Sequence, residues 1–396
     1  MTKLSKIISS LAESETIAMT RKSNEMRAKG TEVISMSLGE PDFPTPDHIK
    51  EAAKRAIDNN YSHYAPVAGY PELRDAIVQK FKRDNNLEYN TSNIMVSNGA
   101  KHTITNILMA LLDPGDEVIL PAPYWVSYRE MIKLAGGVYR IIKTGIDQNF
   151  KISPQQLEDS ITPKTKIIIL NSPSNPSGAV YSENELRELS VVLQKHPDLF
   201  VISDEVYEHI VYEGRHFSLA QIDEIKDQVI VVNSVSKSFA MTGWRIGYMA
   251  GPEWLVKACS NLQGQVTSGV NSVAQMAAVE ALTGPMDETI KMKNIFQKRR
   301  DIIVDEFKKI DGINVMEPDG AFYLFPDVSR LFGRSFNGKL ISNADDLMWY
   351  LLEEAHVATV SGTAFGTPEC IRLSYATSEE NIIKAMRRIT EALTAN

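Results

Sequence analysis

The sequence predicts an α/β fold, with a large domain built on a mainly parallel β-sheet covered by helices, and a smaller α+β domain. Three observations support this prediction. Short apolar runs rich in β-branched residues recur through the middle of the chain, helical stretches lie between them, and the pattern changes after about residue 290. Strands that alternate with helices form βαβ units, which build a doubly wound sheet.

The predicted strands are apolar on both faces, as expected where helices cover the two sides of a parallel sheet. They are the runs 116–120, 166–170, 199–203 and 229–232. A helix is predicted over 183–195, and Ser182 directly before this stretch can cap it. Glu185 lies three residues after Ser182, which is the spacing of a capping box.

The smaller domain is predicted from the last hundred residues. They contain a long charged helix over 289–309, an alternating strand over 320–325, and helices over 344–355 and 378–393. The N-terminal segment is expected to pack against this part of the chain. The expected division is a large cofactor-binding domain, residues 46–289, and a small domain with the N-terminal arm, residues 1–45 and 290–396.

Composition and charge disfavour nucleic-acid-binding, secreted and membrane-spanning proteins. The 396 residues carry a net charge of −8 and no basic stripe, which disfavours a nucleic-acid partner. The N-terminus lacks the sustained apolar segment of a signal peptide and predicts an arm followed by an amphipathic helix. No apolar run approaches the roughly 18 residues needed to cross a bilayer. We therefore expect no membrane partner and a cytoplasmic protein, with Cys259 and Cys370 as reduced, buried thiols.

Polar and charged residues follow the predicted strands, at the edge where open α/β sheets bind ligands. They are Asn175, Asp204, Tyr207, Ser234, Ser236, Lys237 and Arg245. Residues 99–101, before a predicted helix, would present backbone N–H groups that can bind an anion. Taken singly, Asn175 could be a turn residue, Asp204 a helix N-cap and Lys237 a solvated loop cation.

Taken together, these residues fit pyridoxal 5′-phosphate. Its aldehyde condenses with a lysine amine, and its pyridine nitrogen stays protonated when a carboxylate lies behind the ring. Its phosphate needs hydroxyls, backbone N–H groups and an arginine fork, and its 3′-oxygen needs hydrogen-bond donors. The residues after the strands offer each of these groups, and no metal ion is expected.

Nine stretches along nearly the whole chain carry a family pattern. They are SLGEPDFPTP (37–46), YAPVAGYPELRDAI (64–77), SNGAKHTI (97–104), PAPYWVSY (121–128), NSPSNPSGAVY (171–181), SDEVYEHIVYEG (203–214), SVSKSFAMTGWRIGY (234–248), GAFYLFPD (320–327) and IRLSYATSEEN (371–381). In this order they resemble class I aminotransferases of the fold-type-I pyridoxal-phosphate enzymes, in the bacterial aspartate aminotransferase branch. The resemblance implies a large-domain sheet of the seven-stranded type and a homodimer with shared active sites.

The resemblance also implies residue roles. Lys237 would form the Schiff base with the cofactor and later move a proton between the substrate Cα and C4′. Asp204 would pair with the ring nitrogen, and Tyr207 with Asn175 would hold the 3′-oxygen. Trp125 would stack on the ring. The implied phosphate contacts are Ser234, Ser236, Arg245, the backbone of Gly99, Ala100 and Lys101, and Tyr64 of the neighbouring subunit. Arg372 would hold the substrate α-carboxylate, with Asn175, Trp125 and the backbone of Gly39 beside it.

Substrate choice is predicted from Lys101. In the branch that this chain resembles, a lysine after the Gly-Ala pair binds the distal carboxylate of the substrate, which otherwise would be buried unpaired. A lysine is poorly placed for the dipole of a helix N-terminus, and this favours a functional role over mere support of the helix end, which remains the alternative. The expected reaction is ping-pong transfer of the amino group of L-aspartate to 2-oxoglutarate, giving oxaloacetate and L-glutamate.

Other readings of the site remain open. The same fold serves aminotransferases for aromatic, branched-chain, alanine or prephenate substrates, as well as β-lyases and synthases. In relatives, prephenate use is associated with a lysine in the N-terminal arm, where this chain has Ala12. A cofactor-binding regulator is disfavoured because the sequence shows no basic helix-turn-helix, and a dinucleotide-binding protein because no GxGxxG follows a predicted strand.

Overall fold

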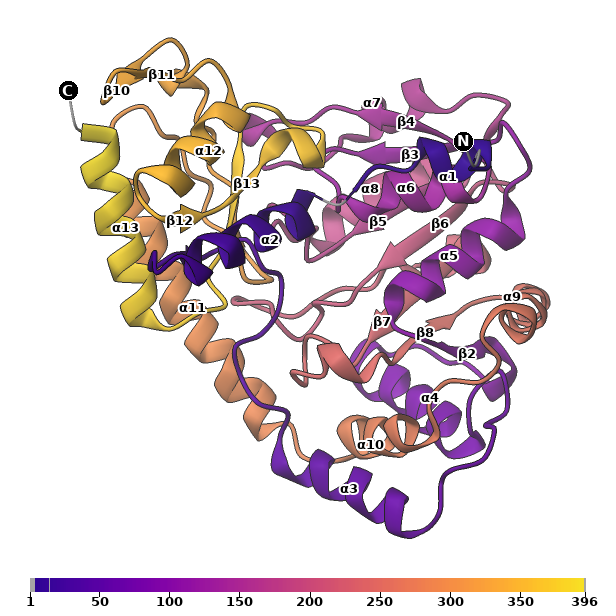
Figure 1. Ribbon diagram of the computed structural model, residues 1–396. Coiled ribbons are helices and arrows are strands. Elements are labelled where there is room, and N and C mark those ends of the chain that lie inside the picture. The colour runs from indigo at the N-terminus through magenta and orange to yellow at the C-terminus, as the bar shows by residue number, and fades with distance from the viewer. Residues whose placement is uncertain (1–3, 14, 395–396) are drawn as a thin grey trace.

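A seven-stranded sheet forms the centre of the computed structural model, which describes residues 4–13 and 15–394 (Figure 1). The strand order is β2 (Ile94–Ser97), β8 (Gly247–Ala250), β7 (Val229–Ser234), β6 (Phe200–Asp204), β5 (Thr165–Asn171), β3 (Glu117–Pro121) and β4 (Val138–Ile142). Neighbouring strands from β7 to β4 are parallel, and β8 runs antiparallel to both β7 and β2. The predicted mainly parallel sheet of seven strands is confirmed.

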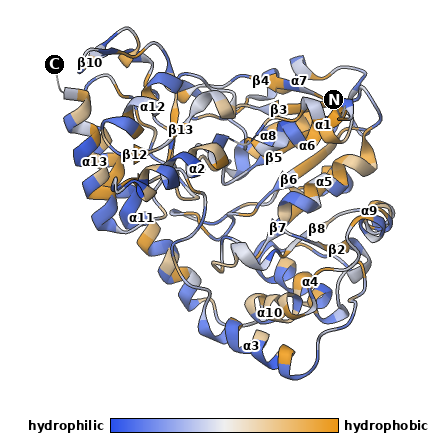
Figure 2. Ribbon diagram, in the orientation of Figure 1, coloured by the Kyte–Doolittle hydropathy of each residue, from blue (hydrophilic) through white to orange (hydrophobic). Residues whose placement is uncertain are grey.

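The central strands are apolar because they are buried on both faces. In β7, Val229 and Val231 enter one hydrophobic cluster, while Ile230 and Val232 enter another on the opposite face. Successive side chains of a strand point to opposite faces, so an uninterrupted apolar run is what a sheet covered on both sides requires. Figure 2 shows hydrophobic residues along these strands and a mixture of hydrophobic and hydrophilic residues along the outer helices.

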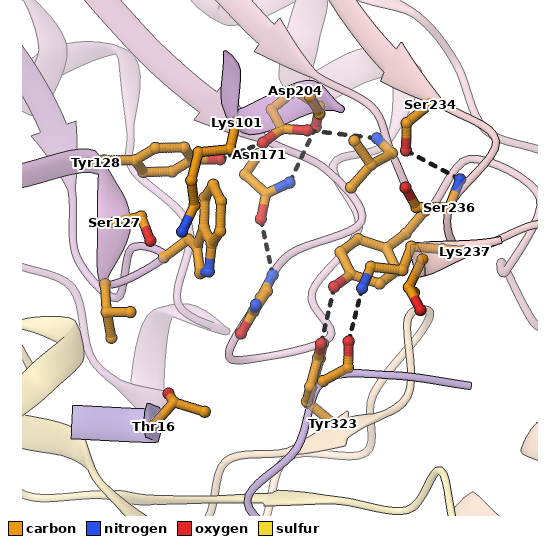
Figure 3. Close-up of a pocket in the computed structure, with 18 of the residues that line it drawn as sticks. Thr16, Lys101, Ser127, Tyr128, Asn171, Asp204, Ser234, Ser236, Lys237 and Tyr323 are labelled. Atoms are coloured by element: carbon orange, nitrogen blue, oxygen red, sulfur yellow. Dashed lines mark hydrogen bonds between the residues drawn. The ribbon is translucent and has the colours of Figure 1, made fainter. Parts of the chain in front are cut away.

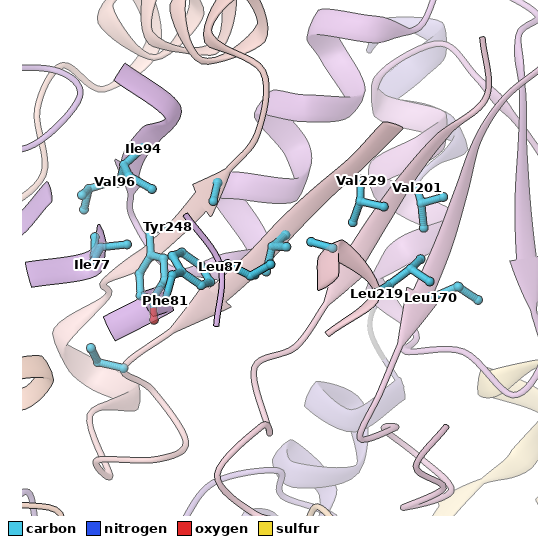
Figure 4. Packing of buried hydrophobic residues seen from close by; sticks show 14 of the residues in the cluster. Ile77, Phe81, Leu87, Ile94, Val96, Leu170, Val201, Leu219, Val229 and Tyr248 are labelled. Carbon is cyan, nitrogen blue, oxygen red and sulfur yellow. The ribbon is translucent and has the colours of Figure 1, made fainter. Parts of the chain in front are cut away.

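Helices cover each face of the sheet. The first cluster receives side chains from α3 (Asp47–Asp58), α4 (Pro71–Asn85), α7 (Pro154–Ser160), α8 (Glu183–Leu193) and α10 (Ser272–Thr283). The second cluster receives them from α5 (Ala100–Leu111), α6 (Ser127–Leu134) and α9 (Glu253–Val266). Figure 4 shows part of the first cluster, where Phe81 of α4 meets Tyr248 of β8 edge to face at 5.9 Å between ring centroids. The sheet is thereby held between two apolar layers.

The start of α8 bears out a detailed prediction. The backbone N–H of Glu185 donates to Ser182 Oγ at 3.3 Å, and the backbone N–H of Ser182 donates to Glu185 Oε2 at 2.7 Å. These reciprocal bonds form the predicted capping box, which satisfies two N–H groups that a helix start otherwise leaves free.

A second group of elements packs around further hydrophobic clusters. It contains the antiparallel sheet β13 (Val360–Ser361), β14 (Ile371–Ser374) and β9 (Tyr323–Leu324), the parallel pair β1 (Ile34–Ser35) and β12 (Val357–Ala358), the hairpin β10 (Ser335–Phe336) and β11 (Lys339–Leu340), and the helices α2 (Glu15–Ala28), α11 (Asp287–Phe307), α12 (Ala344–Glu353) and α13 (Glu379–Thr394). A short helix, α1 (Lys6–Ser10), lies against α6. Pairing of β1 with β12 joins the N-terminal segment to the C-terminal part of the chain, as expected. The division at 45/46 and 289/290 remains a prediction.

The predicted alternating strand over 320–325 is wrong in extent and in pattern. Only Tyr323–Leu324 is a strand, and all six residues are buried. Gly320 makes an isolated bridge with Val211, and Ala321 has a positive φ of 55°, which interrupts an extended strand. The segment therefore does not alternate between core and solvent, because protein packs against both of its sides.

Two further expectations concern cysteines and membranes. Cys259 and Cys370 are both buried and free, as predicted. Within the described part of the chain, no helix combines the length and the apolar character needed to cross a membrane.

Candidate active site

A cavity of about 320 Å³ lies at the edge of the seven-stranded sheet where β5, β6 and β7 end (Figure 3). The predicted site residues that line it are Gly39, Ala100, Lys101, Trp125, Asn175, Asp204, Tyr207, Ser234, Ser236, Lys237, Arg245 and Arg372. They come from the segments that follow three strand ends, the start of α5, the loop before α6, the turn before β8, strand β14 and the segment after β1. The fold thus gathers most of the predicted set around one cavity.

Lys237 is held by a backbone carbonyl from a distant segment. Its Nζ donates to the carbonyl oxygen of Gly39 at 2.6 Å. Burial lowers the pKa of Lys237 to about 8, and the positive charges of Arg245 and Arg372 act in the same direction. A large fraction of this amine is therefore neutral near pH 8, and a neutral amine is the form that attacks a carbonyl or accepts a proton.

Asp204 ends β6 with its carboxylate at the cavity. Tyr128 Oη donates to Asp204 Oδ2 at 2.5 Å, and the backbone N–H of Val206 donates to Oδ1 at 3.4 Å. Burial nevertheless raises the pKa of Asp204 to about 6. A cation placed against this carboxylate would favour its ionised form, so the position suits a protonated ring nitrogen.

The raised pKa of Asp204 predicts how the stability of the ligand-free protein changes with pH. The folded state binds this proton more tightly than the unfolded chain, whose pKa is near 3.8, so the contribution of Asp204 to stability falls as pH rises from about 4 to about 6. The full loss is about 3 kcal/mol by the linkage relation, as an order of magnitude. Urea unfolding from pH 4 to 7 should show this loss in the wild type relative to Asp204→Asn.

The variant Tyr128→Phe supplies the control for that experiment. It removes the hydrogen bond that favours the ionised carboxylate, so the pH window of Asp204 should move upward. A difference between wild type and Asp204→Asn that stays constant from pH 4 to 7 would contradict the assigned shift.

Arg372 is a buried guanidinium that is held by neutral oxygens. Its Nη1 donates to Asn175 Oδ1 at 3.0 Å and its Nη2 to the carbonyl oxygen of Ser37 at 2.5 Å, while its buried Nε has no hydrogen-bond partner. The rings of Tyr323 and Phe365 lie 4.8 and 4.9 Å from the guanidinium carbon. No carboxylate pairs with it among the described residues. A buried cation in this state is prepared for a carboxylate ligand, which it can hold by two parallel hydrogen bonds.

Hydroxyls, an arginine and a helix start form an anion-binding group in the same cavity. Ser234 and Ser236 lie at and just after the end of β7, and α5 begins at Ala100 with no side-chain cap on its free N–H groups. Gly99 has a φ of +84°, and a Cβ there would collide with the guanidinium of Arg245. Glycine at this position lets the helix start approach the arginine. The group offers the donors that a phosphate needs.

Lys101 and Trp125 lie together in the cavity wall. Lys101 Nζ is 5.0 Å from the centre of the Trp125 ring, and that ring meets Tyr128 edge to face at 5.4 Å. Partial desolvation, and then the charge of Arg245, lower the pKa of Lys101. The aromatic face of Trp125 provides a flat wall for a planar ligand.

The charge of the cavity is opposite to that of the whole chain. Its lining contains Lys101, Lys237, Arg245 and Arg372, whereas Asp204 is the only acidic member among the residues that the structure describes. The protein as a whole carries −8. This local excess of cations predicts a ligand with more than one anionic group.

Several lining residues were missed by the sequence analysis. They are Thr16, Ile17, Val126, Ser127, Tyr128, Asn171, Val206, Thr242 and Tyr323. A Trp-x-x-Tyr spacing places Tyr128 one helical turn after Trp125, and this signal could have found it. Asn171 ends β5, where its Nδ2 donates to the backbone oxygen of Asp204 at 2.9 Å. Thr16 and Ile17 come from α2, and no local pattern marks them.

Two predicted residues lie outside the cavity lining. Gly99 lies just behind it, against Arg245. Tyr64 is 97% exposed and does not line the cavity of its own chain. Within residues 4–13 and 15–394, no group of three His, Cys, Asp or Glu side chains could hold a metal ion.

Comparison with known proteins shows a likeness over nearly the full length. The family model for aminotransferase class I and II matches residues 31–389. The probable aspartate/prephenate aminotransferase of Rickettsia bellii is 46% identical over 395 residues, which cover 99% of both chains. The solved aspartate aminotransferase of Rhizobium meliloti has a TM-score of 0.97 at 43% identity, covering 99% of each chain. The aspartate aminotransferase of Thermus thermophilus with maleate has a TM-score of 0.92 at 40% identity, covering 99% of this chain and 100% of the other.

Proposed function

The chain belongs to the class I and class II aminotransferase family, and we propose that it transfers the amino group of L-aspartate to 2-oxoglutarate, giving oxaloacetate and L-glutamate. The proposed mechanism is ping-pong, with pyridoxal 5′-phosphate as the cofactor. The observation that carries the choice of substrate is that two cations, Arg372 and Lys101, line the same cavity as the Lys237 amine.

The cavity fits pyridoxal phosphate in its chemistry. Lys237 offers an amine with a pKa of about 8, and Asp204 a buried carboxylate whose pKa is raised to about 6. The helix start at Ala100, with Arg245, offers donors to a phosphate. When bound, this cofactor supplies an electron-withdrawing ring for the carbon that loses its proton.

Five residues of the site have tasks in the proposal. Lys237 attaches the cofactor and, once freed, its amine takes the proton from the substrate Cα and delivers it to C4′. Asp204 keeps the proton on the ring nitrogen, and Trp125 stacks on the ring. Tyr207 and Asn175 hold the 3′-oxygen, as the family resemblance implies.

A substrate with two carboxylates would pair with both cations that have no task yet, Arg372 and Lys101. The fork of Arg372 would bind the α-carboxylate, and the Nζ of Lys101 would bind the distal carboxylate. Related proteins with this fold are named for aspartate, and one was solved with maleate, itself a dicarboxylate. A monocarboxylic amino acid would leave Lys101 without a partner.

Replacement of Lys101 by methionine tests this specificity. We expect kcat/KM for aspartate to fall about 100-fold, because a charge pair desolvated on binding is worth roughly 3 kcal/mol. Activity on alanine should stay within about threefold, because its side chain does not reach the lysine. Steady-state rates with both amino acids measure the ratio.

The matched control is Lys166→Met. Lys166 is an exposed lysine near the start of β5, at the opposite edge of the sheet from the cavity. It should leave both rates at the wild-type level. Equal losses on aspartate and alanine in Lys101→Met would reject the role in binding the distal carboxylate.

Prephenate is the second candidate substrate, and the name of the Rickettsia bellii relative favours it. The family resemblance would place Ala12 where prephenate-using relatives carry a lysine, which lowers the expected activity. Rates over aspartate, glutamate, tyrosine, alanine and prephenate would rank these specificities, and release of ammonia would reveal a β-lyase.

The proposed assembly is a cytoplasmic homodimer with shared active sites. Tyr64 supports it, since a tyrosine that is 97% exposed has no packing role in its own chain. In the proposal its hydroxyl reaches the phosphate bound by a second copy of the chain.

A further inference from the structure

Tyr323 contacts two residues of the proposed machinery and has no task assigned above. Its Oη lies 2.8 Å from Tyr207 Oη, and its ring covers the guanidinium of Arg372 at 4.8 Å. A Cβ on Gly39 would collide with the Tyr323 hydroxyl, so the backbone of residue 39 passes directly beside it. One fully buried side chain thus contacts the residue proposed for the 3′-oxygen and the residue proposed for the substrate carboxylate.

These two contacts join different sheets. Tyr323 lies in β9 and pairs with Ser374 of β14, the strand that carries Arg372. Strand pairing therefore fixes Tyr323 relative to Arg372. Tyr207 instead follows β6 of the seven-stranded sheet. The hydrogen bond between the two hydroxyls links the carboxylate end of the cavity to the cofactor end.

The number of protons on the two hydroxyls limits how they can bond. Each phenol has one proton, and burial raises the pKa of both, so both are neutral. When the proton of Tyr207 points to an oxygen of a ligand, the bond between the hydroxyls persists only if Tyr323 donates to Tyr207. In a chain of hydrogen bonds each bond polarises the next. The bond from Tyr323 to Tyr207 therefore strengthens the bond that Tyr207 donates to the ligand oxygen.

We propose that Tyr323 is a positioning residue for both ends of the site: its hydroxyl donates to Tyr207 and strengthens the bond that Tyr207 gives to the cofactor oxygen, while its ring fixes the plane of the Arg372 guanidinium. This inference rests on the proposed function, because it concerns a bound pyridoxal phosphate. It adds a residue to which neither the predicted strand nor the family pattern gave a role.

The test compares Tyr323→Phe with Tyr375→Phe. Tyr375 Oη lies 2.9 Å from Tyr212 Oη in another buried pair of hydroxyls, and Tyr375 is absent from the cavity lining. Each variant removes one hydroxyl from such a pair and keeps the ring. The readout is the pH midpoint at which the visible absorbance of the bound cofactor changes, measured on the loaded protein without substrate.

We expect the midpoint to rise by about half a pH unit in Tyr323→Phe and by less than about 0.1 in Tyr375→Phe. Without the hydrogen bond from Tyr323, Tyr207 stabilises a negatively charged 3′-oxygen of the cofactor less. The cofactor proton that titrates beside this oxygen is therefore kept up to a higher pH. An unchanged midpoint in Tyr323→Phe, or an equal change in both variants, would overturn the role of the hydroxyl. Unfolding temperatures of both variants show whether each is folded.

The role of the ring has a separate readout. Tyr323→Leu removes the ring, so the dissociation constant for maleate should rise about tenfold, whereas Tyr323→Phe should stay within about twofold. Equal affinity for maleate in the two variants would overturn the role of the ring. If Tyr323→Leu does not fold, Tyr323→Phe still decides the role of the hydroxyl. A wild-type protein with no pH-dependent visible absorbance would instead reject the proposed function, and this inference with it.

Discussion

Replacement of Lys237 by alanine is expected to abolish covalent attachment of pyridoxal phosphate and to lower the transamination rate by about 10⁴-fold or more. The reason is that this amine has two tasks in the proposal, attachment of the cofactor and transfer of the proton from Cα. Burial and two neighbouring arginines, which lower its pKa to about 8, prepare it for both. Borohydride reduction followed by peptide mass analysis should place the fixed cofactor on Lys237 in the wild type and nowhere in the variant.

The variant Lys237→Arg separates charge from chemistry. It keeps a cation in the cavity but supplies no amine that can attack an aldehyde, so the covalent bond should again be absent. Reversible binding of the cofactor should survive in both variants, because the anion-binding group around Arg245 is unchanged. Covalent cofactor on another lysine, such as Lys101, would reject the assignment of Lys237.

The sheet could be predicted because its physical cause is local. A strand buried on both faces must be apolar at every position, and the runs around Ile168 and Val231 satisfy this within a few residues. The capping box at Ser182 is local for the same reason. The segment 320–325 was misread because its burial depends on distant parts of the chain, such as Val211, that cover its second side.

The site could be predicted in part because topology gathers strand ends. In a parallel sheet, residues that follow β5, β6 and β7 meet at one edge, so Asn175, Asp204 and Lys237 were expected to lie together. Tyr323 and Thr16 could not be found in this way. They reach the cavity from other elements, and only the packing of those elements decides which side chains point inward.

Each cation of the cavity could be identified from the sequence, but whether a carboxylate pairs with it could not. Arg372 and Arg299 are both buried arginines in the same part of the fold. Arg299 is paired with Asp42 through two hydrogen bonds of 2.7 and 2.9 Å, whereas Arg372 has no carboxylate partner among the described residues. The pairing depends on contacts across more than 250 residues of sequence, and it makes one arginine structural and leaves the other free for a ligand.

Replacement of Arg372 by methionine should therefore lower kcat/KM about 1,000-fold for every amino acid, because the α-carboxylate common to all of them loses its fork in a desolvated site. In the wild type, maleate at 100 times its dissociation constant should stabilise the protein by about 2.7 kcal/mol. This protection should vanish in Arg372→Met. Thermal unfolding with and without maleate measures it.

The control, Arg299→Met, should behave in the opposite way. Arg299 is buried but Asp42 is exposed to solvent, so breaking their pair leaves a solvated carboxylate and should cost only about 1–2 kcal/mol of stability. Protection by maleate should nevertheless be retained, because Arg299 is not part of the cavity lining. Loss of maleate protection in both variants would mean that the effect comes from general destabilisation, and the assignment of the carboxylate site to Arg372 would fall. Loss in Arg372→Met alone ties ligand binding to the arginine that has no carboxylate partner in the described part of the chain.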